Sequence, residues 1–248
     1  MIWDLRRFRP LWQALLLTFV LVALAQLMQG IPTLDRYVWS RIQDSPVYRS
    51  TRQDKAIALT FDTVWGTDYS QEIISVLKAE KVPATFFVAG WWVQRNPDAF
   101  KGILLAGHEV GNATQNYLHL RALSDGRAQQ EFRDCHQQLE LAMGKRATLF
   151  RPPYGEQDTR LGEITKALGY RTVLWSLDTQ DWQSKEPKTI AQTIVDGAEP
   201  GAIVLLHTSA AATPKALEQA ISNLKQKGYT FHTVSDLLSP NKTVLKGR

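Results

Sequence analysis

Polar side chains that could do chemistry follow several short apolar runs in this sequence. Asp62 and Thr63 come directly after the run 56–61, and His207 comes after the apolar run 202–206. If these runs are strands of a parallel sheet or barrel, their carboxyl ends meet at one edge, where side chains face a cleft. Further polar residues at comparable positions are Asn112, Thr114, Arg151, Asp178 and Asp181. Together they predict an acid–base site built from carboxylates, a guanidinium and an imidazole.

Asp62, Arg151 and His207 each have a defined chemical role available at such an edge. A nearby guanidinium favours the charged form of a carboxylate, so Arg151 could hold Asp62 ionised. His207 could donate or accept a proton near neutral pH. Each residue also has a structural alternative, because a strand-end Asp can cap a helix or form a turn, and a lone His can belong to the packing. Taken singly, the residues leave both interpretations open.

The elements that would position these residues alternate between strands and helices from residue 55 onward. Apolar or β-prone runs predict strands at 56–61, 84–89, 108–112, 149–151, 170–176, 201–207 and 230–234. Amphipathic patterns predict helices at 70–80, 97–106, 123–143, 161–168, 187–197 and 214–227. Asn96 and Ser124 are the expected N-caps of the second and third helices, and Gly144 is the expected end of the third. The alternation predicts an α/β fold with a parallel sheet, open or closed into a barrel.

The N-terminal region predicts a membrane-targeting segment. Residues 11–31 are uncharged and mostly apolar, and three arginines lie within the basic segment 1–10. Such a run is long enough to span a bilayer as a helix, and the arginines predict that the N-terminus stays in the cytoplasm. We expect a single-pass anchor with the rest of the chain outside the cytoplasm. The alternative is a signal peptide cleaved after the small-x-small pattern at 23–25, which would give a secreted protein.

The remaining composition narrows the classes of function. The chain has 248 residues, of which 44% are hydrophobic and 21% charged, and its net charge is +5. This is enough for one core domain, with residues 32–54 as a linker and residues 239–248 as a disordered tail. The basic residues are scattered, so we predict that the chain does not bind nucleic acid. Cys135 is the single cysteine, which excludes an internal disulfide and a multi-cysteine metal site. The oligomeric state is left open.

Five sequence blocks, in this order, resemble the polysaccharide deacetylase (NodB-homology) family. They are Thr60 to Asp62, Gly107 to Asn112, Arg151 to Gly155, Asp178 to Trp182 and Leu205 to His207. The resemblance covers about residues 55–238, and with the N-terminal anchor and Trp65-Gly66 after the first block it is closest to the sporulation-type deacetylases. It implies a distorted (β/α) barrel, which in this family usually has fewer than eight strands. It also implies a hydrolase that removes acetyl groups from peptidoglycan or chitin-like polymers.

The resemblance also implies roles for individual residues. Asp62 matches the base that activates water, and His207 matches the acid that protonates the leaving amine. Arg151 matches the residue that positions the base, and Asp181 matches the one that tunes the acid–base pair. Residues that would contact the substrate are Tyr154, through its backbone N–H at an oxyanion, and Trp182 and Leu205, as walls of the acetyl pocket.

The sequence departs from the family at the three metal ligands, an Asp and two His. Thr63, Ala113 and Tyr117 stand at these positions, and none is a good zinc ligand. Zinc lowers the pKa of water from about 15.7 to about 7, so its loss forgoes roughly 12 kcal/mol of water activation. A general base supplies only about 10²–10⁴-fold in rate. We therefore predict no bound metal cofactor. His108 and His119 lie near these positions, but one precedes and one follows them.

Three hypotheses follow for this chain. The first is an extracytoplasmic hydrolase of acetylated cell-wall amino sugars, with Asp62 as base and His207 as acid. The second is a catalytically weak or inactive glycan-binding protein that keeps the cleft. The third is a membrane-tethered scaffold in which the barrel is only a fold.

Overall fold

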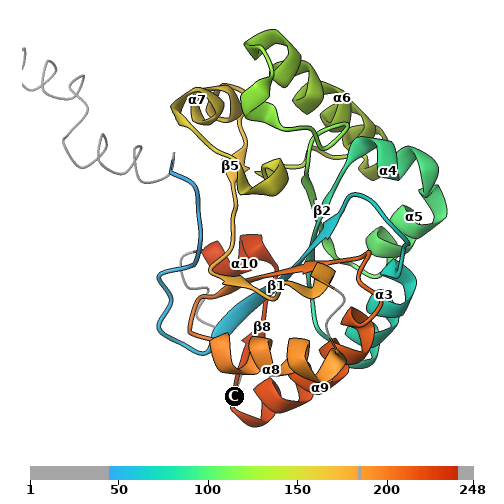
Figure 1. Ribbon diagram of the computed structural model, residues 1–248, viewed down its shortest axis with the longest axis vertical. Helices are drawn as coiled ribbons and strands as arrows, with labels where there is room; N and C mark the ends of the chain where they lie inside the picture. Colours follow the sequence, from blue (N-terminus) through green and yellow to red (C-terminus); the bar gives the residue numbers. More distant parts are fainter. Residues whose placement is uncertain (1–44, 184–185, 240–248) are drawn as a thin grey trace, which may run out of the picture. The chain divides into compact units, whose positions relative to one another are not determined.

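The computed structural model describes residues 45–183 and 186–239, and in these residues eight parallel strands form one sheet (Figure 1). The strands lie in the order β5-β4-β3-β2-β1-β7-β6, and β8 pairs with β1. Their bounds are β1 (Ala56–Thr63), β2 (Thr85–Val88), β3 (Glu109–Asn112), β4 (Leu149–Phe150), β5 (Arg171–Thr172), β6 (Leu177–Asp178), β7 (Ile203–His207) and β8 (Thr230–Phe231). The predicted parallel α/β sheet is confirmed.

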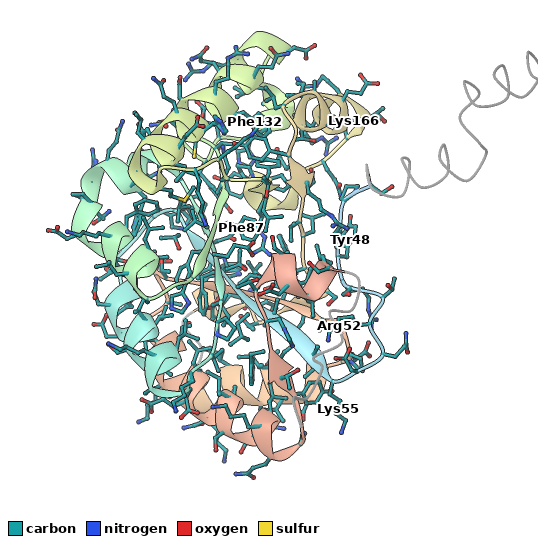
Figure 2. The ribbon with its side chains drawn as sticks, turned by 180° about the vertical axis from the view of Figure 1, so that it is seen from behind. Tyr48, Arg52, Lys55, Phe87, Phe132 and Lys166 are labelled. Atoms are coloured by element: carbon teal, nitrogen blue, oxygen red, sulfur yellow. The ribbon has the colours of Figure 1, made fainter. Side chains whose placement is uncertain are left out.

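The sheet curves into a half-barrel whose two end strands, β5 and β6, do not pair with each other. A short extended segment before β1 is hydrogen-bonded to β5 and to the chain just before β7. The N–H of Val47 donates to the carbonyl of Thr172 over 2.9 Å, and the N–H of Ser50 donates to the carbonyl of Gly201 over 2.8 Å. Residues 47–50, which the sequence placed in a linker, are thus hydrogen-bonded to the domain. Tyr48 and Arg52 mark this segment in Figure 2.

The helices lie on the outside of the sheet (Figure 1). They are α3 (Ser70–Ala79), α4 (Gly90–Arg95), α5 (Pro97–Leu105), α6 (Asp125–Met143), α7 (Thr159–Ala167), α8 (Pro187–Gly197), α9 (Thr213–Gln226) and α10 (Val234–Leu238). Short 3-10 turns occur at η2 (Leu120–Ala122), η3 (Pro153–Gly155) and η4 (Asp181–Gln183). The six predicted helices are confirmed, while α4 and α10 were not predicted.

Local signals at the helix ends had mixed outcomes. The Ser124 hydroxyl accepts a hydrogen bond from the N–H of Arg127, and Gly144 ends α6 in the left-handed conformation, as predicted. Asn96 stands at the N-cap position of α5, as predicted, but its side chain does not cap the helix, because its amide donates to the carbonyl of Trp92 in the preceding helix. The predicted strand 170–176 is also wrong in its extent. Only Arg171–Thr172 is a strand there, and β6 begins just beyond it at Leu177.

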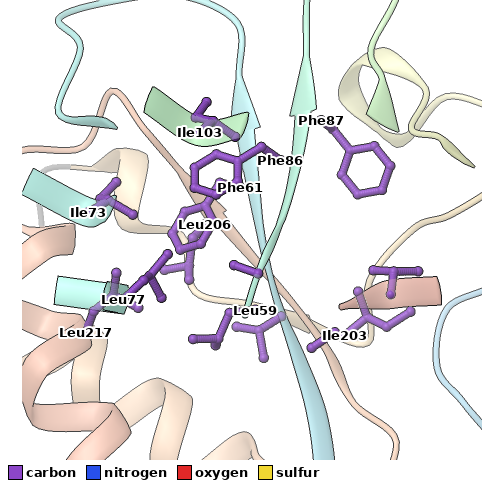
Figure 3. Packing of buried hydrophobic residues seen from close by; sticks show 14 of the residues in the cluster. Leu59, Phe61, Ile73, Leu77, Phe86, Phe87, Ile103, Ile203, Leu206 and Leu217 are labelled. Carbon is purple, nitrogen blue, oxygen red and sulfur yellow. The ribbon is translucent and has the colours of Figure 1, made fainter. Parts of the chain in front are cut away.

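The core lies between the sheet and the helices (Figure 3). Successive side chains of a strand point to opposite faces, so Leu59 and Phe61 of β1 pack toward the helices. Phe61 stacks on Phe86 of β2, with ring centroids 4.9 Å apart. The same alternation turns Thr60 and Asp62 to the other face of β1. The packing of the apolar face therefore fixes which way the polar side chains at the strand end point.

The predicted anchor at 11–31 lies outside the described residues, as do the basic segment 1–10 and most of the predicted tail. Across residues 45–183 and 186–239, we find no helix with the length and apolar character needed to cross a membrane.

His108 is a buried imidazole just before β3. Only 9% of the residue is exposed, and neither ring nitrogen has a hydrogen-bond partner. Its ring lies 5.3 Å from that of Phe86. Burial lowers the pKa of His108 from 6.5 to about 4, because a charged ring would lose its hydration here. The neutral ring is therefore part of the folded core.

This burial predicts a pH-dependent loss of stability. The folded pKa lies below the unfolded one, so the unfolded chain binds more protons between pH 6.5 and about 4. Stability should fall by about 3 kcal/mol as the pH drops through this window, and the loss should be absent above it. Urea denaturation of His108→Phe, which keeps an aromatic ring beside Phe86, should show a flatter pH profile than wild type. An equal slope in both proteins would contradict the assignment.

Candidate active site

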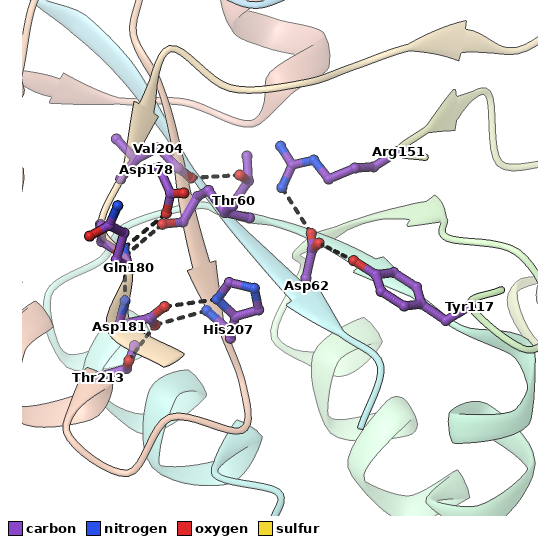
Figure 4. Close-up of polar contacts among 12 residues, drawn as sticks. Thr60, Asp62, Tyr117, Arg151, Asp178, Gln180, Asp181, Val204, His207 and Thr213 are labelled. Carbon is purple, nitrogen blue, oxygen red and sulfur yellow. Dashed lines mark hydrogen bonds and ion pairs between the residues drawn. The ribbon is translucent and has the colours of Figure 1, made fainter. Parts of the chain in front are cut away.

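Asp62 and His207 lie at the carboxyl-terminal ends of two neighbouring strands, at the same level. Asp62 is the register partner of His207 in the pairing of β1 with β7. Adjacent strands lie about 4.8 Å apart, and both side chains point to the face away from Phe61 and Leu206. Figure 4 shows the carboxylate and the imidazole at this edge of the sheet. The sheet therefore brings together the two residues that the sequence singled out, although 145 positions separate them.

Asp62 is held by a buried ion pair. Nη1 of Arg151 donates to Oδ1 of Asp62 over 3.0 Å, and the arginine side chain is fully buried. The guanidinium also donates to the carbonyls of Val173 and Leu174 and lies 4.1 Å from the ring centre of Phe87. These contacts fix the guanidinium from three sides. The predicted proximity of Arg151 to Asp62 is therefore present in the structure.

The second oxygen of Asp62 is bonded to Tyr117, which the sequence analysis treated only as a lost metal ligand. The phenol of Tyr117 donates to Oδ2 of Asp62 over 3.0 Å. Burial, with the charge of Asp62 next in effect, raises the pKa of Tyr117 well above its ordinary value. The phenol thus stays protonated and acts as a donor. Both carboxylate oxygens of Asp62 are occupied by protein groups.

His207 is oriented by Asp181, which follows β6. Nδ1 of His207 lies 2.8 Å from Oδ1 of Asp181, and the backbone N–H of His207 donates to Oδ2 over 2.9 Å. The hydroxyl of Thr213 donates to the same Oδ2 over 2.6 Å. Burial alone would lower the pKa of His207, but the hydrogen bond to Asp181 and the nearby carboxylates raise it. Because Nδ1 is bonded to the carboxylate, Nε2 is left to face a ligand.

The three residues expected to contact a substrate lie around this pair. Leu205 lies two positions before His207 in β7, so the two side chains share a face. Trp182 follows Asp181 and is 56% exposed. Tyr154 is 46% exposed, and its hydroxyl donates to the carbonyl of Tyr117 over 3.4 Å. By contrast, the polar strand-end residue Asn112 points elsewhere, since its amide donates to Phe132 and Tyr170.

Strained backbone is concentrated around the same edge. Among non-glycine residues described, five have positive φ, and four of them lie in the loops at this edge: Thr114, Tyr117, Tyr154 and Gln180. Such conformations cost about 1–3 kcal/mol each and are found preferentially at functional sites. This observation points to the strand-end edge as the functional part of the domain, independently of its residue types.

The family's metal does not fit the residues at this site. The hydroxyl of Thr63 is buried without a hydrogen-bond partner, Ala113 offers no donor atom, and the oxygen of Tyr117 is committed to Asp62. Zinc prefers imidazole, thiolate and carboxylate ligands. Within residues 45–183 and 186–239, no three His, Cys, Asp or Glu side chains are grouped so as to hold a metal ion.

Sequence reasoning missed two contributors to the site. Thr213, at the start of α9, bonds Asp181, and Trp65, directly after β1, is exposed beside Tyr117. The only sequence signal for Trp65 is a large aromatic residue in a loop that follows a buried strand and precedes Gly66. Thr213 had no such signal, because its contact arises from the packing of α9 against η4.

Comparisons with known proteins bear on the family of this chain. A family model for polysaccharide deacetylase matches residues 49–173. The chain is 38% identical over 190 residues to a peptidoglycan-N-acetylglucosamine deacetylase of Bacillus cereus, covering 75% of this chain and 89% of that protein. It is 35% identical over 195 residues to the peptidoglycan-N-acetylmuramic acid deacetylase PdaA of Bacillus subtilis, covering 77% and 74%. Of two other relatives, from B. subtilis and Listeria monocytogenes, the chain spans 63% and 42% of their lengths.

A solved structure is also similar over most of the domain. BA3943 of Bacillus anthracis, a CE4 family pseudoenzyme, superposes with a TM-score of 0.76 at 32% identity, covering 79% of this chain and 69% of that one. A mutant of BA3943 with restored enzymatic activity has the same TM-score at 33% identity. Sequence and structure agree, and the chain belongs to the polysaccharide deacetylase family.

Proposed function

We propose that this protein binds the acetylated glycan strands of peptidoglycan outside the cytoplasmic membrane and has lost efficient deacetylation. The single observation that carries the proposal is the hydrogen bond from Tyr117 to Asp62. With Arg151 on the other oxygen, each oxygen of Asp62 already accepts one hydrogen bond from the protein, so Asp62 has fewer acceptor positions open to water than an unpaired carboxylate. Thr63, Ala113 and Tyr117 replace the donor set that a metal would need.

The glycan is inferred from the relatives. Their names give peptidoglycan amino sugars as substrates of those proteins. In this chain, exposed aromatic side chains lie beside Asp62 and His207 at the sheet edge. The similarity to a pseudoenzyme supports a member of the family that binds without turnover. We also propose that residues 11–31 place the domain outside the cytoplasm, either as an anchor or as a signal peptide that is removed.

Slow residual hydrolysis is the second candidate function. It is favoured by the hydrogen bonds that orient His207 through Asp181 and Thr213, because a binding protein has no need of an oriented imidazole. In this case Asp62 would act as the base and His207 as the acid, and Asp62→Asn should abolish acetate release. Activity that persists in this variant would place the chemistry elsewhere.

Cosedimentation with insoluble peptidoglycan tests the proposed function. The full chain, purified in detergent, is expected to sediment with peptidoglycan to the same extent with and without EDTA, and to release no acetate from it. Bovine serum albumin in the same detergent is the control for non-specific sedimentation. Failure to sediment would reject the binding role. Acetate release that EDTA abolishes would show a metal-dependent enzyme and reject the loss of deacetylation.

A further inference from the structure

Four aromatic rings form a continuous cluster at the edge of the site, on the Asp62 side. Trp65 contacts Tyr117 edge to face, with centroids 4.7 Å apart and planes at 89°. Trp65 also lies 5.7 Å from Tyr154, and His119 stacks on Tyr154 at 4.0 Å. We call Trp65, Tyr117, Tyr154 and His119 the aromatic rim. Through the phenol of Tyr117 it is joined directly to Asp62.

Trp65 is held in place although it is not part of the core. It is 42% exposed, whereas Val64 before it is buried. Gly66 after it has φ +82°, and a Cβ there would lie 2.8 Å from Cβ of Ser209, which follows His207. The loop that carries Trp65 therefore packs closely against the loop after β7. An exposed indole that is already ordered loses little conformational entropy when a ligand packs on it.

The ring faces of the rim are not equally available. One face of the Tyr154 ring is covered by His119, whose Nδ1 lies 2.8 Å from a Glu156 carboxylate oxygen. Tyr117 is buried. Trp65 meets its neighbours edge to face or at a tilt, which leaves a broad apolar surface on the exposed indole. Of the four rings, Trp65 offers the best platform for a flat, partly apolar ligand.

Trp182 provides a second exposed aromatic ring on the opposite side of Asp62 and His207. In the sheet order β3-β2-β1-β7-β6, Tyr117 follows β3 and Trp182 follows β6, while Asp62 and His207 lie between them on β1 and β7. A ligand that reached both Trp65 and Trp182 would cross the pair in the middle. Because two strands, β1 and β7, lie between the ends of this arrangement, an oligosaccharide rather than one sugar ring is the ligand that fits it.

We propose that Trp65 is a stacking platform for a pyranose ring of an acetylated amino-sugar chain, and that the site holds at least two consecutive sugars between Trp65 and Trp182. Pyranose rings present apolar C–H faces that pack on aromatic rings. This inference rests on the proposed glycan-binding function. It adds which side chains the consecutive sugars contact, namely Trp65 and Trp182. No covalent step is involved.

Calorimetric titration of the full chain with N-acetylglucosamine oligomers of one, two and four units tests the inference. Affinity should rise from monomer to tetramer. Trp65→Ala should weaken tetramer binding about tenfold, while Trp65→Phe should stay within about threefold of wild type. Leu141→Ala, which removes an even more exposed apolar side chain on α6, is the control and should bind as wild type.

Tryptophan fluorescence gives a second readout that a purely structural role would not affect. Saturating tetramer should change the wild-type emission, and a large part of the change should be missing in Trp65→Phe although that variant still binds. This readout remains usable if Trp65→Ala fails to fold. Tetramer binding that is equal in wild type and Trp65→Ala would overturn the platform and leave the proposed function standing. Absence of binding to both tetramer and peptidoglycan in wild type would reject both.

Discussion

Combining Thr63→Asp, Ala113→His and Tyr117→His in one chain is expected to raise its zinc content to about one ion per chain, where the wild type should hold none. The variant supplies a carboxylate and two imidazoles, the donor set that zinc prefers, at the three positions where the fold now presents a hydroxyl, a methyl group and a phenol. It also removes the phenol that occupies Oδ2 of Asp62. Elemental analysis of the purified full chain measures the effect.

The same variant should gain deacetylation. A catalytic zinc can contribute roughly 12 kcal/mol through the lowered pKa of water, and recovery of about 4 kcal/mol of it would raise the rate about 10³-fold. Release of acetate from peptidoglycan and from N-acetylglucosamine tetramer is the assay. Tyr117→Phe is the matched control, since it frees Oδ2 of Asp62 without adding a ligand, and it should bind no zinc. A triple variant that binds zinc but releases no acetate would show that Asp62 and His207 are not competently placed.

Replacing Arg151 with Met is expected to lower the free energy of unfolding by about 3–5 kcal/mol, the cost of leaving a buried charge without its partner. Asp62 and Arg151 are both buried, and the guanidinium makes two further hydrogen bonds to backbone carbonyls. For a domain of this size the melting temperature should fall by roughly 6–20 °C. Urea denaturation at pH 7 measures the free energy directly.

A double-mutant cycle separates the ion pair from the general loss of packing. Asp62→Asn combined with Arg151→Met should be less destabilised than the sum of the two single variants, because the second change removes the charge that the first leaves unpaired. Arg49→Met, which breaks the exposed pair with Glu199, is the surface control and should cost at most about 1 kcal/mol. An Arg151→Met variant no less stable than Arg49→Met would refute the buried pair as a structural element.

Local patterns were sufficient to predict most of the elements. A continuous apolar run predicted β7 and its end at His207, because a strand buried on both faces has no polar alternation. Ser124 and Gly144 predicted both ends of α6, because the groups that satisfy helix termini are local in sequence. The same reasoning failed at 170–176, where the pairing partners of the chain, rather than its own residues, decide what is strand.

The arrangement of the site was only partly accessible from local patterns. The five blocks predicted the polar residues at the strand ends and the family, and the family is confirmed by the comparisons. That Asp62 and His207 are neighbours depends on β7 pairing directly with β1, a contact between segments far apart in the chain. Sequence spacing carries no information about this order, because the packing of all the helices and strands selects it.

The individual contacts within the site were decided by tertiary structure alone. The resemblance predicts that Tyr117 stands where the family has a metal ligand, but not that its hydroxyl reaches Asp62 or that Trp65 remains exposed beside it. These facts depend on backbone conformations at Tyr117 and Gly66 with positive φ and on loops that meet across the sheet edge. Periodicity and residue type reveal which side chains are buried and which are polar. Hydrogen bonds and ring contacts between distant parts of the chain form only when separate loops are packed together.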